Sequence, residues 1–249
     1  MPAVAVAPHM KRAVQQNFDV SVAAYDAYER RTGRFSTLTR LLGAELRART
    51  DTSFHRLLDA GAGTGVSTTV LAEIADAVVA LDISRAMLAD NAGTTRVQGD
   101  FDSLPFAADS FDAVAYTASL FLVPDPMVAV EEARRVLRDG GVVGTIAPLG
   151  WVDEDGTDIF ETLPRQSRSP TPAGDVKTAL DGAFSTTTGT WSFPTTAENV
   201  KQFHRIPAMA ARLYPRDDPE ERVRKAAELL DTLEGTFEQR WQWVVGVRK

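Results

Sequence analysis

Short apolar runs alternate with helical stretches along residues 55–150 of the chain. The runs are five to eight residues long and mostly rich in β-branched residues, which is typical of strands buried inside a sheet. We therefore expect five strands, at residues 56–60, 77–83, 96–100, 111–117 and 142–149.

Three helices are expected between these strands, at residues 65–75, 84–92 and 126–141. The last has Pro126 at its start and the pair Gly140–Gly141 as a stop signal. Strands that alternate with helices are joined by right-handed crossovers, which places them parallel in a sheet covered on both faces. The pattern predicts a doubly wound α/β fold.

The N-terminal segment 11–50 has a helical period instead. Apolar residues recur there at about one-turn spacing over two stretches, which predicts two helices. The first stretch contains Val14, Phe18, Val22 and Tyr25, and the second contains Phe35, Leu38, Leu41 and Leu42.

Four further segments follow the core. Residues 151–175 are rich in Asp, Gly, Pro, Ser and Thr, so we expect a mobile loop there. Residues 184–194 and 236–249 alternate between polar and apolar side chains, and each is predicted to form a strand. Residues 196–234 are mostly helical in pattern.

Composition and charge narrow the function classes. The chain has 249 residues, a formal net charge of -7 and no cysteine, which excludes a disulfide, a thiolate metal site and a cysteine nucleophile. No metal-binding spacing of His, Asp or Glu is present, so no metal site is predicted. The acidic balance of residues 51–150 argues against a nucleic-acid partner.

The N-terminal apolar stretch is far shorter than the ~20 residues of a membrane span. Charged residues follow this stretch instead of preceding it, which is the wrong order for a secretory signal. We expect a cytoplasmic protein without a membrane span.

A candidate binding motif begins where the first expected strand runs into glycines at 61, 63 and 65. Glycine allows a sharp turn and lets a ligand approach the backbone, next to free N–H groups and a helix start. A dinucleotide fingerprint counted from Gly61 would need its third glycine where Val66 stands. The spacing therefore disfavours a pyrophosphate cradle, although a simple tight turn stays open.

Acidic residues also mark the ends of the next two expected strands. At such a strand end Asp82 can accept hydrogen bonds from ribose hydroxyls. The alternative is a helix cap at Asp82 or Ser84; we expect Ser84 to be the cap, which leaves Asp82 free to face the crevice. Asp100 can accept from an exocyclic amine beside Phe101, or can simply be a turn residue.

These segments together resemble the class I S-adenosylmethionine-dependent methyltransferases. The resemblance is to the group of the ubiquinone/menaquinone-biosynthesis C-methyltransferases, methyltransferase type 11. The matching motifs are LLDAGAGTG (57–65), ALDISRAML (80–88), GDFDSLPFAADSFDAV (99–114) and RVLRDGGVV (135–143).

The N-terminal NFDVSVAAYD (17–26) is similar to the helix that caps the cofactor pocket of this family. It departs from the family at Val22, where alanine is usual. The resemblance spans about residues 17–150, fades over 151–230, and returns in FEQRWQWVVGVRK at the end of the chain.

The resemblance implies a mostly parallel, seven-stranded, Rossmann-like sheet with an antiparallel C-terminal strand and a helical lid. Residues 1–249 would form a single methyltransferase domain. Its parts would be an N-terminal cap (11–50), a cofactor-binding core (55–150), an acceptor-side insertion (151–234) and a closing strand (235–249).

The resemblance also implies S-adenosylmethionine as the cofactor, with S-adenosylhomocysteine as its product. Asp82 would bind the ribose and Asp100 the adenine amine, while Tyr25 and Thr117 would border the methyl group. Tyr25 has a second interpretation as a core aromatic. The residues expected to contact the cofactor are Tyr25, Asp59, Gly61, Ala62, Gly63, Gly65, Asp82, Ile83, Met87, Asp100, Phe101 and Thr117.

The implied reaction is transfer of the methyl group to a small-molecule acceptor by in-line displacement, governed by proximity and orientation. His204 is the one histidine considered as a general base, against the alternative of a surface histidine. The insertion offers apolar side chains for a hydrophobic or aromatic acceptor, or for a core of its own: Phe160, Trp191, Phe193, Phe203, Met209 and Tyr214.

Two other functions stay open. One is a protein that binds S-adenosylmethionine without turnover, because the binding residues would be the same. The other is a Rossmann NAD(P)-dependent oxidoreductase, which Val66 disfavours. A nucleic-acid methyltransferase is not expected, because the segment TASLFLVPDP at 117–126 lacks both the Asn/Asp-Pro-Pro-aromatic turn and a Pro-Cys nucleophile.

Overall fold

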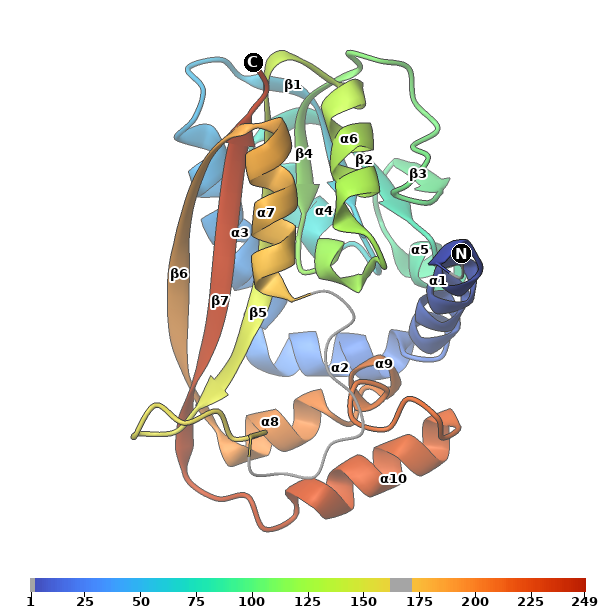
Figure 1. Cartoon of the computed structure of the whole chain (residues 1–249), viewed down its shortest axis with the longest axis vertical. Helices are drawn as coiled ribbons and strands as arrows, with labels where there is room; N and C mark the ends of the chain where they lie inside the picture. Colours follow the sequence, from blue (N-terminus) through green and yellow to red (C-terminus); the bar gives the residue numbers. More distant parts are fainter. Residues whose placement is uncertain (1–2, 162–171) are drawn as a thin grey trace.

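A seven-stranded sheet forms the centre of the molecule in the computed structural model, which describes residues 3–161 and 172–249. Its strand order is β3-β2-β1-β4-β5-β7-β6 (Figure 1). The strands are β1 (Phe54–Ala60), β2 (Ala75–Asp82), β3 (Thr95–Gln98), β4 (Phe111–Tyr116), β5 (Leu137–Val152), β6 (Ser185–Thr196) and β7 (Thr236–Val247).

Helices surround this sheet. The helices are α1 (Ala3–Asp19), α2 (Val22–Thr32), α3 (Arg34–Arg47), α4 (Val66–Leu71), α5 (Arg85–Asp90), α6 (Pro126–Val136), α7 (Ala173–Ala183), α8 (Ala197–Phe203), α9 (Pro207–Ala210) and α10 (Pro219–Leu230), with a short 3-10 helix η1 (Leu120–Leu122).

The strand directions confirm the predicted fold. Strands β1 to β5 pair in parallel, and β7 runs antiparallel between β5 and β6. The α3 and α4 helices pack on one face of the sheet, where Leu38, Leu42 and Leu71 are buried. The α6 and α7 helices cover the other face with Val130 and Leu180, among other residues. The sheet is therefore doubly wound. The carboxyl ends of its parallel strands point toward α2 and α9 (Figure 1).

The N-terminal segment contains three helices, so the prediction of two was wrong. One helix ends at Asp19 and the next begins at Val22, and a second interruption lies at Gly33. Gly33 has a φ of 56° and donates its N–H to the Glu29 carbonyl at 2.7 Å. Only glycine adopts this left-handed conformation without strain. Consequently Phe18 and Tyr25 lie on different helices, although their spacing fits one.

The predicted helix 126–141 ends earlier than expected. Asp125 caps it by accepting from the Met127 N–H at 2.9 Å, and Pro126 is its first residue. The helix stops at Val136 because Leu137 already pairs with Phe111 of β4. The expected stop at Gly140 and Gly141 was wrong, since both lie within β5 where the register shifts.

Two other predicted boundaries also change. The helix expected over 65–75 is α4, which ends at Leu71, because Ala75 already pairs with Phe54 in the sheet. The loop expected over 151–175 is shortened at both ends: β5 continues to Val152 beside β7, and α7 begins at Ala173. Residues 162–171 of that loop lie outside the described residues.

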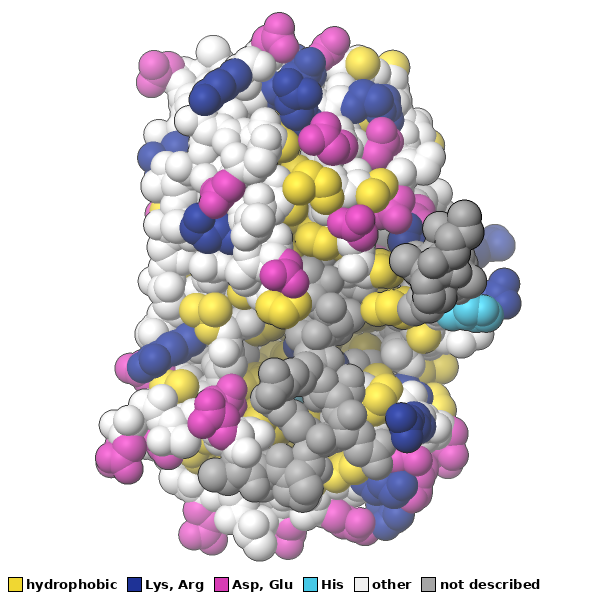
Figure 2. Space-filling view, in the orientation of Figure 1, with side chains coloured by type: hydrophobic (Ala, Val, Ile, Leu, Met, Phe, Trp, Pro, Cys, Tyr) yellow, Lys and Arg dark blue, Asp and Glu magenta, His cyan; other side chains and the backbone are white. Residues whose placement is uncertain are grey.

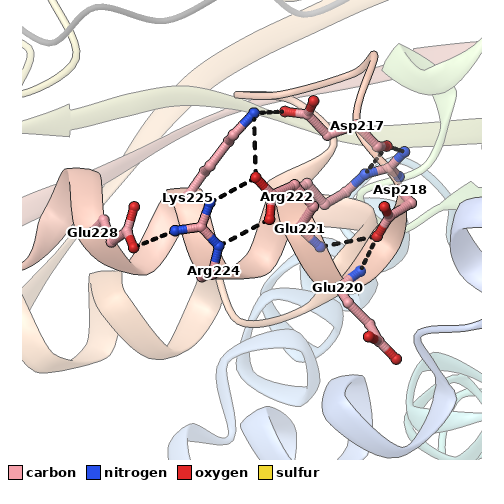
Figure 3. A network of polar contacts seen from close by, with 8 residues as sticks. All are labelled: Asp217, Asp218, Glu220, Glu221, Arg222, Arg224, Lys225 and Glu228. Atoms are coloured by element: carbon pink, nitrogen blue, oxygen red, sulfur yellow. Dashed lines mark hydrogen bonds and ion pairs between the residues drawn. The ribbon is translucent and has the colours of Figure 1, made fainter.

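The C-terminal segment 196–234 is mostly helical, as predicted. Its longest helix, α10, starts with Asp218 as a cap that accepts from the N–H groups of Glu220 and Glu221 (Figure 3). Along its surface Arg224 contacts both Glu221 and Glu228. The buried Arg222 belongs to the same network through the Asp217 carbonyl, and it also donates to Asn17 of α1, which ties the C-terminal helices to the N-terminal ones.

Asp112 joins the starts of β4 and β1. Replacing it should lower the free energy of unfolding of the protein. Its buried carboxylate accepts from the N–H groups of His55 and Arg56 at 2.5 and 2.8 Å, and pairs with Arg138 at 2.8 Å. Asp112→Ala leaves these donors unsatisfied. This should lower the free energy of unfolding, measured in urea, by about 2–4 kcal/mol. Asp76→Ala, which removes a carboxylate that is 70% exposed, is the control and should change little. Equal losses would contradict the role of Asp112.

Candidate active site

A cavity that is partly open to solvent lies at the carboxyl ends of the parallel strands. Strand ends and loops of the sheet form its floor, and α1, α2 and α9 lie near the carboxyl ends of the strands (Figure 1). Phe35, at the start of α3, also lines the cavity. Its lining residues are Lys11, Val14, Phe18, Tyr25, Phe35, Gly61, Gly63, Asp82, Ile83, Met87, Gly99, Asp100, Phe101, Thr117, Ala118, Ser119, Leu122, Val123 and Met209.

The glycine turn after β1 forms one wall. Gly61, Gly63 and Gly65 all have positive φ angles, of 82°, 51° and 95°. A Cβ on Gly61 would collide with Ser119, whereas a Cβ on Gly63 would meet no atom within 4 Å. Gly61 and Gly63 line the cavity, and the other two predicted residues of the turn do not: Gly65 faces Asn91, and Ala62 is buried.

Asp59 lies beneath this turn and does not line the cavity. Its carboxylate is fully buried and accepts from the hydroxyls of Ser67 and Thr68 at 2.8 and 2.7 Å, so it orients the first turn of α4. Burial raises the pKa of Asp59 from its ordinary value near 3.8 to about 6, although the two hydroxyls oppose the shift.

Asp82 lines the cavity at the end of β2. One carboxylate oxygen accepts from the Gly63 N–H at 2.9 Å, and the other from the Ser84 N–H at 2.8 Å. Ser84 caps α5 by accepting from the Met87 N–H at 3.1 Å, as predicted. Asp82 therefore faces the crevice, as expected with Ser84 as the cap, and its contact with the Gly63 N–H also holds the glycine turn in place. Burial raises its pKa, against the effect of the backbone N–H groups.

Asp100 lines the cavity after β3, and a lysine reaches it from α1. The Lys11 Nζ atom lies 2.8 and 2.7 Å from the two carboxylate oxygens of Asp100, and it also contacts Asp102. Burial alone would lower the pKa of Lys11, but the two carboxylates outweigh it and raise the pKa. Phe101 lies next to Asp100, with its ring against the edge of Tyr116 at 5.1 Å.

Tyr25 of α2 and Thr117, which follows β4, both line the cavity. Tyr25 stacks on Phe35 at 4.8 Å, so it is a cavity wall and a packed aromatic at once. Burial and then nearby carboxylates raise the pKa of Tyr25 well above its ordinary value, which keeps the phenol neutral. Thr117 precedes Ala118, whose φ of 56° is unusual for a residue other than glycine.

The sequence alone missed how the N-terminal helices attach to the cavity. Besides the Lys11 contact, Asp19 accepts from the Ser84 hydroxyl at 2.6 Å, and Asp26 accepts from the Thr64 hydroxyl at 2.7 Å. One polar contact thus reaches the loop after each of β1, β2 and β3. These pairs are 38 to 89 positions apart, so no local pattern signals them.

Residues 58–144 match the family of the methyltransferase domain. This match lies on the strands and loops that make the cavity floor. Over residues 58–144 the chain is similar to a methyltransferase domain. Solved structures agree on the fold: the YcgJ protein from Bacillus subtilis is 18% identical with a TM-score of 0.59, over 84% of this chain and 97% of that one. A methyltransferase from Thermotoga maritima, described as a possible histamine N-methyltransferase, is 17% identical with a TM-score of 0.55, over 95% and 100%.

Relatives with named activities match the methyltransferase domain more closely in sequence. A 2-methyl-6-phytyl-1,4-hydroquinone methyltransferase from Oryza sativa subsp. japonica is 34% identical over 122 residues, which are 45% of this chain and 35% of that protein. A demethylmenaquinone methyltransferase from Mycobacterium sp. (strain KMS) is 47% identical over 90 residues, 34% of this chain and 38% of that protein. The chain thus spans little more than a third of the length of these relatives.

The apolar residues proposed for the acceptor mostly lie elsewhere in the methyltransferase fold. Met209 of α9 lines the cavity. Phe160 and Phe203 are buried with Trp151, and Trp191 stacks on Trp243. Phe193 lies beneath the Arg34 guanidinium, and Tyr214 lies near Lys225. Apart from Met209, these side chains therefore pack within the insertion and against its neighbours.

His204 does not line the cavity, and it is not a surface histidine either. It is buried, and its Nδ1 donates to the Val200 carbonyl at 2.8 Å. Burial lowers the pKa of His204 to about 4. Within residues 3–161 and 172–249, no His, Asp or Glu side chains cluster as a metal site would require, and no described helix is long and apolar enough to cross a membrane.

Alanine should be tolerated far better at Gly63 than at Gly61. Gly61→Ala would place its Cβ 2.7 Å from the Ser119 Oγ atom, and should cost about 2–4 kcal/mol in urea unfolding. Gly63→Ala should cost only the ~1 kcal/mol of a left-handed backbone. Removing the clashing side chain in Gly61→Ala/Ser119→Gly should restore part of the loss. Equal costs for the two alanine variants would contradict the close approach.

Asp59 should make the protein less stable as the pH rises from about 4 to 6. Its carboxyl group ionises near 3.8 in the unfolded chain and near 6 in the folded one, so the folded state holds the proton longer and stability falls across that window. Asp59→Asn cannot ionise and should lack this slope, a difference of up to about 3 kcal/mol. Urea unfolding of both proteins from pH 4 to 7 measures it. A difference that does not change with pH would refute the raised pKa.

Proposed function

We propose that the protein transfers a methyl group from S-adenosylmethionine to a small, mainly apolar acceptor. The observation that carries this proposal is a single cavity in which two kinds of wall meet. One wall has the glycine turn, Asp82 and Asp100 at three neighbouring strand ends. The opposite wall is apolar and comes from helices α1, α3 and α9 with the loop after β4: Val14, Phe18, Phe35, Met209, Leu122 and Val123.

The residues of this cavity fit the cofactor. The space above Gly63 is open where a Cβ would stand, so a ligand can lie against the turn. Asp82 and Asp100 offer carboxylate oxygens for the ribose hydroxyls and the adenine amine. Burial raises the pKa of Tyr25 most, and the carboxylates of Glu29, Asp82, Asp59 and Asp26 raise it further, so negative charge lies near this wall. A positively charged sulfonium group is favoured near such charge.

The chain's own residues would act by holding and enclosing the reactants. The bound cofactor supplies a methyl group that is already activated. The glycine turn, Asp82 and Asp100 would fix its position, while α1, α2 and α9 exclude water from the cavity. Thr117 and Tyr25 would border the space between donor and acceptor. Catalysis would come from proximity and alignment, with no described histidine at the cavity.

The acceptor that fits best is a neutral aromatic small molecule. The apolar wall favours it, and the two relatives with named activities act on a hydroquinone and on demethylmenaquinone. Nucleic acid is disfavoured by the net charge of -7. On the face in Figure 2, Lys and Arg side chains are interspersed with Asp and Glu and form no continuous basic stripe. We further propose that the chain acts as a single domain in the cytoplasm.

Binding and turnover test this function in two steps. S-adenosylhomocysteine should bind in the micromolar range by calorimetry, and NAD(H) should not bind. Asp82→Asn should weaken S-adenosylhomocysteine binding by about 1–3 kcal/mol while the variant still folds. Asp76→Asn, a change far from the cavity on the exposed part of β2, is the control. Preferred binding of NAD(H) would refute the proposal.

The second step adds radiolabelled S-adenosylmethionine with 1,4-naphthohydroquinone or catechol as the acceptor, and with glycine as a charged control. Label should move to an aromatic acceptor and not to glycine. Binding without transfer to any acceptor in a broader aromatic panel would instead support a protein that binds the cofactor without turnover.

A further inference from the structure

Lys11 contacts the Asp100 carboxylate, which the proposed function needs as the acceptor for the adenine amine. The Lys11 Nζ atom lies between both carboxylate oxygens of Asp100, at 2.8 and 2.7 Å. Both residues line the cavity, and the Lys11 side chain is only 16% exposed. Among the cavity-lining residues Lys11 is the sole Lys or Arg. The contact is therefore part of the cavity wall, although the Asp100 side chain is still 39% exposed.

An adenine amine and the Lys11 ammonium group are unequal competitors for this carboxylate. Hydrogen bonds from a charged donor to a carboxylate are roughly twice as strong as those between neutral groups. The third Asp100 contact is local, since the Asp102 N–H donates to an Asp100 oxygen at 3.0 Å. An incoming amine thus meets a carboxylate whose two oxygens already carry donors.

Asp102 supplies Lys11 with a second partner in the same place. The Lys11 ammonium contacts the Asp102 carboxylate as well as that of Asp100. It can therefore leave Asp100 without becoming an unpaired, half-buried charge, which would otherwise be costly. The remaining contacts of α1, from Asp19 to Ser84 and from Asn17 to Arg222, hold the helix in place during this exchange.

We propose that Lys11 sets the affinity of the cavity for adenine nucleosides by competing for Asp100, and that Asp102 receives Lys11 when the ligand binds. This inference rests on the proposed function. It assigns Lys11 and Asp102 opposite effects: Lys11 opposes binding, and Asp102 relieves that opposition. A merely structural salt bridge would make both residues affect binding in the same direction.

Calorimetry with S-adenosylhomocysteine on three variants tests these signs. Lys11→Met should tighten binding about threefold to tenfold, and Asp102→Asn should weaken it by a similar factor, as expected for a partly buried ion pair. The double variant should bind like Lys11→Met, because Asp102 acts only through Lys11. Arg12→Met is the matched control, since Arg12 is the next residue of α1 and is exposed.

S-inosylhomocysteine identifies the group that competes. It has a carbonyl in place of the adenine amine, so it does not need Asp100 as an acceptor. Its affinity should change less than twofold in Lys11→Met and Asp102→Asn. Equal shifts for the two ligands would overturn the proposal, as would weaker binding of S-adenosylhomocysteine to Lys11→Met or an unchanged affinity.

Hydrogen exchange without ligand separates this inference from the proposed function. Lys11→Met should speed amide exchange of α1 residues in the ligand-free protein, and Arg12→Met should not. If exchange responds but the wild-type protein binds no S-adenosylhomocysteine, the proposed function fails and the role of Lys11 in binding fails with it. If the wild-type protein binds the ligand but neither exchange nor affinity responds to Lys11→Met, only this inference fails.

Discussion

The close approach of the glycine turn to the loop after β4 is the constraint on which the cavity depends. Gly61 lies so near Ser119 that no side chain fits between them, and Ser119 donates to the Ala60 carbonyl at 2.7 Å. The N–H groups of Gly61 and Ala62 both bind the Leu81 carbonyl, at 2.7 and 3.0 Å. The ends of β1, β2 and β4 are thereby joined by contacts in which the helices above the cavity take no part.

The carboxylates of Asp82 and Asp59 near this floor accept from uncharged donors, and the second oxygen of Asp59 has no hydrogen-bond partner among the described residues. Backbone N–H groups bind Asp82, and the hydroxyls of Ser67 and Thr68 bind Asp59. Such donors hold an oxygen in place without cancelling its charge. Lys11 changes this balance only beside Asp100, where a cation enters the wall. The two ends of the cavity therefore differ in charge, and the more negative end is the one proposed for the sulfonium group.

The sequence predicted most of the core correctly, because its strands are buried on both faces and read as apolar runs. It also identified Ser84 as a cap from residue type and position alone. Its errors share one cause: a local signal was overruled by a distant partner. Gly140 and Gly141 look like a helix stop, but pairing of Leu137 with Phe111 ends the helix first. Val14 to Tyr25 look like one helix, but the chain turns at Ser21, whose hydroxyl accepts from the Ala208 N–H.

By itself the sequence determined the α/β alternation, the glycine turn and the acidic residues at the strand ends, because each of these depends on neighbours within a few positions. Only the tertiary structure decided which of them meet a cavity: Gly63 and Asp82 do, whereas Asp59, Ala62 and Gly65 lie behind its wall. Only the tertiary structure brought Lys11 to Asp100 and placed Met209 in the wall of the same cavity as Gly61 and Gly63. Contacts between residues so far apart leave no periodic trace in the chain, since they arise from how helices pack across the sheet ends.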